Sequence, residues 1–147
     1  MIVIRNYIIT VFCSFFFVGA IGQDLSKMPA SKLKGFGDNA VTIGDTYSAI
    51  DYFEAYMVKK PKDSKTAFTL GECYRASRNY KKALEWYKKA YDLKPEKELK
   101  ALYYYGQMLK TEQNFDESLN SFIKFKKAYD EDDKLKKLVK YQIEGCE

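Results

Sequence analysis

Residues 70–95, LGECYRASRNYKKALEWYKKAYDLKP, decide the fold of this chain. The apolar residues of 66–76 and 80–93 recur at the period of an amphipathic helix, so we predict a helix in each range. Residues 77–79 separate the two helices because they favour turns. Pro95 ends the second helix, since it has no backbone N–H and disfavours helix at the residue before it.

The same spacing of large and small residues occurs three times in the chain. The middle copy is marked by Leu70, Gly71, Tyr74, Ala83, Tyr87, Ala90 and Pro95. About 34 residues earlier stand Phe36, Gly37, Ala49, Phe53, Tyr56 and Pro61. The third copy follows after one extra residue in the connection behind Pro95, and it has Tyr105, Gly106, Leu109, Ser118 and Phe122. The chain therefore divides into units at 30–63, 64–97 and 99–132.

Each unit is expected to be a pair of antiparallel helices. Two helices approach closely only where one of them carries almost no side chain, which is the role we assign to Gly71 and Ala83. The large residues around them fill the space that flanks the contact. One pair cannot cover its own apolar surface, so successive pairs stack into a solenoid.

This pattern resembles the tetratricopeptide repeat (TPR) family. The resemblance implies an all-α, right-handed solenoid of helical hairpins, with about three repeats over residues 30–132. Residues 133–147 contain one more amphipathic pattern and are expected to form a capping helix. The third unit departs from the family pattern, because Ser118, Phe125 and Asp130 replace its usual alanine, small residue and proline.

The N-terminus has the layout of a secretory signal. Residues 7–22 are apolar and uncharged, and they end in small residues after a short segment containing Arg5. We therefore expect a signal peptide at 1–22, a linker at 23–29, and a periplasmic or outer-membrane-associated protein. The alternative is an uncleaved anchor, which would be the chain's only link to a membrane.

The composition argues against an enzyme. The chain has no histidine, no cysteine cluster with zinc spacing and no glycine-rich phosphate loop, so we expect no catalytic residue, cofactor or metal. The net charge of +5 is interleaved along helices and lacks a nucleic-acid-binding motif, so we expect no nucleic-acid partner. Cys73 lies on an apolar helix face and is expected to be buried; the sequence leaves open whether it meets Cys146.

What remains is a binding surface. In a TPR array the first helix of each pair lines a concave groove, which implies these groove residues: Lys34, Asp38, Lys65, Phe68, Glu72, Arg75, Lys100, Tyr103, Gln107 and Lys110. Phe68 and Tyr103 are the large apolar groups among them, flanked by cations, and aromatic residues and arginine are favoured anchors. The alternative is a solvated face with incidental aromatics. A Lys/Asn clamp for a C-terminal carboxylate is not expected, because the matching positions of unit one are Lys34 and Asp38.

The signal and the Tyr/Lys-rich repeats are also similar to the N-terminal region of Bacteroidetes envelope proteins that join TPRs to a β-propeller and an OmpA-like domain. Some of those proteins are associated with type IX secretion and gliding. The resemblance implies an exported scaffold that docks other envelope proteins or peptides, within a secretion, gliding or peptidoglycan-associated outer-membrane assembly. The alternative is a periplasmic chaperone or assembly factor that holds client polypeptides.

Overall fold

The computed structural model describes residues 24–129 and 133–145, so the predicted signal at 1–22 and Cys146 lie outside the described residues. A short 3-10 helix, η1 (Leu25–Lys27), precedes the helices. The α-helices of the described ranges are α1 (Ala30–Thr42), α2 (Thr46–Lys59), α3 (Ser64–Ala76), α4 (Tyr80–Leu93), α5 (Leu99–Thr111), α6 (Phe115–Ala128) and α7 (Asp133–Glu144).

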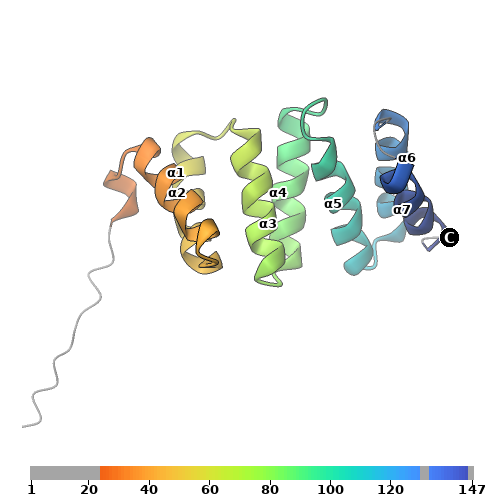
Figure 1. The fold of residues 1–147 in the computed structure, drawn as a ribbon, viewed down its shortest axis with the longest axis horizontal. Helices are drawn as coiled ribbons and strands as arrows, with labels where there is room; N and C mark the ends of the chain where they lie inside the picture. Colours follow the sequence, from red (N-terminus) through yellow and green to blue (C-terminus); the bar gives the residue numbers. More distant parts are fainter. Residues whose placement is uncertain (1–23, 130–132, 146–147) are drawn as a thin grey trace, which may run out of the picture.

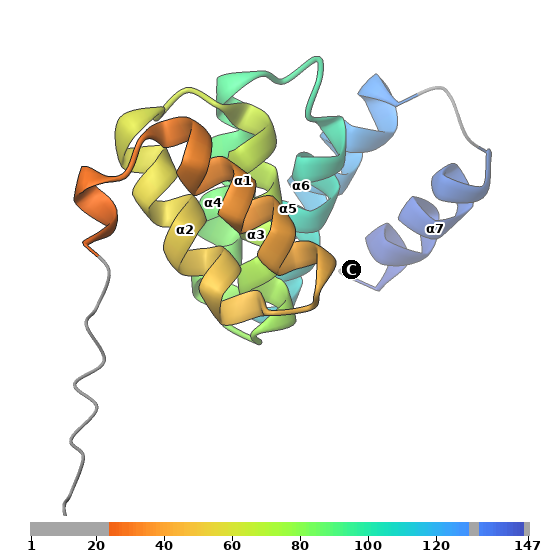
Figure 2. The ribbon, with the colours of Figure 1, turned by 60° about the vertical axis from the view of Figure 1, so that its left-hand side comes forward.

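The helices pack as successive hairpins. α1 packs on α2, α3 on α4 and α5 on α6, and each second helix also contacts the first helix of the next pair. Figure 1 shows the pairs side by side along the long axis of the molecule. At the C-terminal end α7 packs against α6. Figure 2 shows α7 at the right-hand end of the row of helices. Val139 of α7 is fully buried, so this helix covers the end of the stack.

The three hairpin turns have one backbone design. Gly44, Arg78 and Gln113 all adopt a left-handed conformation, with φ of 78°, 61° and 62°. In each turn the next residue donates its backbone N–H to a carbonyl near the end of the first helix, as Asn79 does to Tyr74 at 2.9 Å. This is the hydrogen bond of a Schellman-type helix end. The turn therefore comes from backbone geometry that Gly, Arg and Gln all provide.

The close contact inside each pair is a ring lying on a glycine. A Cβ atom added to Gly71 would stand 2.8 Å from ring carbons of Tyr87, and one added to Gly37 would stand 2.5 Å from Phe53. Gly106 has the same relation to Phe122 at 3.0 Å. The sequence pairs each glycine with the small residue of the second helix; the structure adds that an aromatic ring, one turn further on, covers the glycine directly.

The structure accommodates the departures in the third unit. Ser118 is fully buried and donates its hydroxyl to the carbonyl oxygen of Gly106 at 2.8 Å, so a hydrogen bond accompanies the contact that alanine usually makes. Phe125 is also buried, and its ring stacks on that of Tyr129 with centroids 4.9 Å apart. The larger side chain is therefore accommodated because it packs in an aromatic stack at the end of α6.

We predict that Gly71→Ala destabilises the protein and that Gly35→Ala does not. Alanine gains about 1 kcal/mol of helix propensity at either site. At Gly71 the new methyl would strike the buried ring of Tyr87, and overpacking of this kind costs roughly 1–3 kcal/mol. Gly35 is exposed on α1 with nothing within 4 Å of the added atom, so it is the matched control. Urea unfolding measures both; equal stabilities would contradict the ring-on-glycine contact.

Cys73 supplies a second prediction. Its thiol is buried, and burial, followed by the nearby charge of Glu72, raises its pKa to about 11. Below that pH the folded protein keeps the thiol protonated, and only the thiolate reacts with iodoacetamide. In a variant with Cys13 and Cys146 replaced by serine, alkylation at pH 8 should be slow in buffer and at least about a hundredfold faster in urea, where the pKa returns to its ordinary value. Rapid labelling of the native variant would contradict the burial.

Candidate functional site

The groove face is formed by the first helices α1, α3 and α5, and on α1 one of the two expected groove residues is used by contacts within the protein. Lys34 donates to the Thr66 hydroxyl at 2.9 Å and stands 5.4 Å from the centre of the Tyr56 ring. It thereby joins the first unit to the second and is half-buried. Asp38 is exposed. The sequence places both residues in the groove, but Lys34 serves the interface between repeats.

The centre of the groove face holds a charged network over an aromatic floor. Arg75 donates to Glu72 at 2.7 Å and to the Tyr87 hydroxyl at 3.2 Å, and the Tyr87 hydroxyl itself donates to Glu72. The Arg75 guanidinium also lies 5.4 Å from the centre of the Tyr104 ring. The hydrogen bond to Glu72 raises the pKa of Arg75 above its ordinary value. The pKa of Tyr87 is also raised, first by burial and then by the Glu72 carboxylate. The guanidinium therefore keeps its charge throughout the physiological range.

Phe68 is the half-buried aromatic group of this face. Its ring centroid lies 5.7 Å from that of Tyr87 and 5.9 Å from that of Tyr104, while those two rings stack on each other at 5.4 Å. Lys65 and Lys100 are exposed, and in the described part of the structure neither ammonium group has a hydrogen-bond or ion-pair partner. An aromatic surface flanked by unpaired cations is thus available here.

The third unit corrects one expectation. Tyr103 is only 6 % exposed, so it is not an open anchor in the groove. Its ring packs 5.7 Å from Phe122 and 5.5 Å from Phe125, and its hydroxyl accepts a hydrogen bond from Gln107 at 2.9 Å. The cause is the bulky Phe125, which brings α6 side chains over this part of α5. Gln107 is half-buried, and burial raises the pKa of Tyr103.

Lys110 is half-buried and is engaged by the last helix. Its ammonium group is 3.4 Å from the Gln142 side-chain oxygen of α7 and 3.5 Å from the Gln142 carbonyl oxygen. This cation therefore helps to hold the last helix against the stack.

A hollow of about 510 Å³ adjoins Phe68 and Lys100. Beside these two residues it is lined by Glu96, Lys97, Glu98, Leu99, Ala128 and Tyr129. Sequence reasoning missed Tyr129 because it considered only the first helix of each unit, and it missed Leu99 because it placed only Lys100, Tyr103, Gln107 and Lys110 of α5 on the groove side. The spacing of Phe125 and Tyr129, one helical turn apart, was the available signal. Of the expected groove residues, Phe68 and Lys100 therefore line this hollow. Glu72 and Arg75 form the charged network over the Tyr87 and Tyr104 rings that Phe68 contacts, and Lys65 is exposed one helical turn before Phe68.

The described residues contain no group of three or more Cys, Asp or Glu side chains arranged to hold a metal ion. Among the same residues, no helix combines the length and apolar character that crossing a membrane requires.

Residues 43–125 match the family model described as anaphase-promoting complex, cyclosome, subunit 3, and the chain belongs to this TPR-type repeat family. No curated protein matches the chain. Solved structures that resemble it at low sequence identity include TPR domains, and they confirm the all-helical TPR solenoid.

Three of those structures illustrate the likeness. One is the Yersinia enterocolitica type III secretion chaperone SycD in complex with a peptide of the translocator YopD. It is 19% identical with a TM-score of 0.68, and the match covers 79% of this chain and 90% of the SycD chain. The TPR2B domain of yeast Sti1, in a complex with pHsp70, is 12% identical with a TM-score of 0.66. The match covers 80% of this chain and 94% of the Sti1 chain. The Sgt2 TPR domain from Aspergillus fumigatus is 21% identical with a TM-score of 0.63 and coverages of 84% and 80%.

We predict that Tyr87→Phe lowers the free energy of unfolding by about 1 kcal/mol, the usual net value of a buried hydrogen bond. The substitution keeps the ring on Gly71 but removes the hydroxyl that contacts Arg75 and Glu72. Tyr80→Phe is the control, because that half-buried tyrosine has no hydroxyl hydrogen bond in the described structure. Equal effects of the two substitutions in urea unfolding would argue against the network.

Proposed function

We propose that the protein is a non-enzymatic scaffold that docks a polypeptide segment on the face of α1, α3 and α5. The observation that carries the proposal is Phe68, half-exposed on an aromatic floor between the unpaired cations Lys65 and Lys100 and beside a hollow of about 510 Å³. A peptide can place an apolar side chain on the ring and a carboxylate near either ammonium group. Aromatic anchors of this kind carry much of the binding energy in interfaces.

Further support comes from proteins of the same fold. SycD holds a peptide of YopD, and the TPR2B domain of Sti1 forms a complex with pHsp70. With the predicted signal at residues 1–22, we propose that the partner is another protein of the cell envelope, in the periplasm or at the outer membrane. Membership of a secretion, gliding or peptidoglycan-associated assembly, type IX secretion included, is part of this proposal and rests on the sequence resemblance alone.

A second candidate is a chaperone or assembly factor that holds client polypeptides. Chaperone-like proteins among the similar structures favour it. The groove face favours fixed docking, because charged residues surround its aromatic group Phe68 and the central pair Arg75–Glu72 is already joined at 2.7 Å. An adaptable client-holding surface would offer a broader apolar area.

We expect Phe68→Ala to weaken capture of the partner about tenfold, the effect of losing a typical anchor. The measurement is crosslinking in intact cells followed by purification and quantification of the captured protein. Phe36→Ala is the matched control, since Phe36 is an exposed aromatic that packs on Tyr52, away from the hollow. Lys65→Glu with Lys100→Glu tests the same surface without disturbing packing, because both side chains are exposed.

The pattern of captured proteins separates the two candidates. One discrete partner that is lost in both groove variants supports docking, whereas many clients retained at reduced levels support a chaperone. Capture that is unaffected by either groove variant would overturn the placement of the site.

A further inference from the structure

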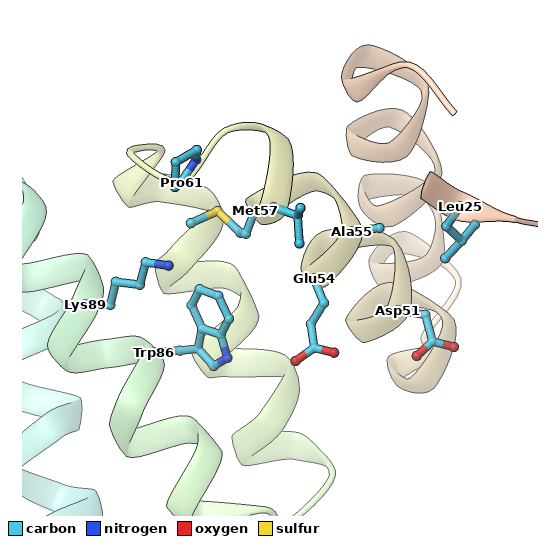
Figure 3. A pocket seen from close by; sticks show the side chains of 9 residues that line it. Leu25, Asp51, Glu54, Ala55, Met57, Pro61, Trp86 and Lys89 are labelled. Carbon is cyan, nitrogen blue, oxygen red and sulfur yellow. The ribbon is translucent and has the colours of Figure 1, made fainter. Parts of the chain in front are cut away.

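A second hollow, of about 670 Å³, lies on the opposite side of the hairpins from the groove residues. It opens between α2 and α4, next to η1, and no side chain of α1, α3 or α5 lines it. Figure 3 shows its lining side chains: Leu25, Asp51, Glu54, Ala55, Met57, Val58, Pro61, Trp86 and Lys89. We call this the outer pocket. Since it shares no residue with the groove hollow, it can be occupied independently.

The outer pocket has an apolar floor and an open apolar rim. Met57 is buried, and Trp86 is half-buried beneath the opening. Val58 is 82 % exposed, which is unusual for a large aliphatic side chain in a helix. Together they offer a place for an aliphatic side chain from another segment.

One side of the outer pocket is acidic. Glu54 accepts a 2.5 Å hydrogen bond from the Tyr74 hydroxyl, and Asp51 stands one helical turn earlier on α2. Burial, then the hydrogen bond and charge of Glu54, and then the charges of Asp51 and Glu85, raise the pKa of Tyr74. Of these carboxylates, Glu85 is paired with Lys82 at 3.2 Å. In the described structure neither Asp51 nor Glu54 has an ion-pair partner. These carboxylates are uncompensated although the whole chain carries a net charge of +5.

One cation of the chain itself, the Lys89 ammonium group, already contacts the outer pocket. The Lys89 ammonium stands 4.5 Å from the centre of the Trp86 ring, the geometry of a cation–π contact. In Figure 3 Lys89 and Glu54 lie on different sides of the Trp86 side chain. A second cation can therefore be received on the carboxylate side without displacing Lys89.

The repeat itself supplies an internal comparison. The corresponding hollow one unit later, about 450 Å³ between α4 and α6, has Lys88, Asp92 and Ser121 where the outer pocket has Glu54, Val58 and Trp86. There Lys88 and Asp92 pair with each other at 2.6 Å. Among the described residues, this second hollow has no tryptophan or exposed valine, and one carboxylate without an ion-pair partner, Glu117, where the outer pocket has two. Packing of the solenoid therefore does not require Trp86, Val58 or the pair of free carboxylates.

We propose that the outer pocket docks a basic amphipathic segment of a partner protein. An aliphatic side chain of the segment packs on Met57, Val58 and Trp86, and a lysine or arginine one turn away pairs with Asp51 and Glu54. Charge complementarity selects this occupant: an acidic segment would meet two unpaired carboxylates, and a neutral one would leave them uncompensated. The protein then binds two segments at once, one on each face.

Trp86 allows a direct test because it is the only tryptophan of the chain. The probes are the peptide Ac-LKALAKALKAL-NH2 and the same peptide with every lysine replaced by glutamate. We expect the basic peptide to shift Trp86 emission saturably and the acidic peptide to leave it unchanged. Absence of a saturable shift, or stronger binding of the acidic peptide, would overturn the proposal.

Two charge-matched double variants locate the effect. Asp51→Asn with Glu54→Gln should weaken binding of the basic peptide about tenfold, while Asp92→Asn with Glu117→Gln should change it by less than about twofold. Each pair removes two carboxylates, and each includes one that accepts a tyrosine hydroxyl, from Tyr74 or Tyr105, which glutamine can still accept. Equal weakening by both pairs would reduce the effect to general electrostatics and refute the site.

Two further outcomes are informative. An emission shift that depends on protein concentration without any peptide would assign the outer pocket to a second copy of the chain and overturn the proposal. Phe68→Ala should leave the emission titration unchanged, so failure of the groove proposal and failure of this one can be told apart.

Discussion

The contact between a glycine and an aromatic ring is the constraint on which the rest of the structure depends. Gly37, Gly71 and Gly106 each lack the one atom that would collide with the ring of the second helix. Only at this separation can the two helices of a pair share a core and present both outer faces to neighbours and solvent. In the middle unit the ring on glycine belongs to Tyr87, whose hydroxyl continues into the groove to meet Glu72 and Arg75. The same side chain thus closes the hairpin and helps to build the candidate site.

The fold was predictable because its determinants are local and repeated. A glycine, a small residue and a ring recur at one spacing in all three units, and a proline ends the first two. The ring contacts the glycine within its own unit. The site was less predictable because exposure depends on what the neighbouring element brings. Tyr103 has the same place in its helix as Phe68, yet Phe125 and Phe122 of α6 cover it. Lys34 likewise occupies a groove position but is used by Thr66 of the next unit.

The two faces of the solenoid differ in their unpaired charge. On the groove face Lys65 and Lys100 lack partners among the described residues, whereas on the outer face it is Asp51 and Glu54 that lack cations. Interleaved charge in the sequence hides this separation, because helical periodicity distributes successive residues to different faces. A protein with a modest net charge can therefore present unpaired cations beside one hollow and unpaired carboxylates beside another.

In a repeat protein the units serve as references for one another. A feature that appears in every unit, such as the left-handed residue of the turn, is explained by the fold. A feature found in one unit alone needs another explanation, because the neighbouring unit shows that the same backbone packs without it. Trp86 beside Val58 is such a feature, because the counterpart hollow one unit later has Ser121 and Asp92 at these positions, and its Asp92 is paired with Lys88. Burying an exposed aliphatic group and neutralising free carboxylates both favour association, so the departure from the repeat is itself the physical argument for a ligand on the outer face.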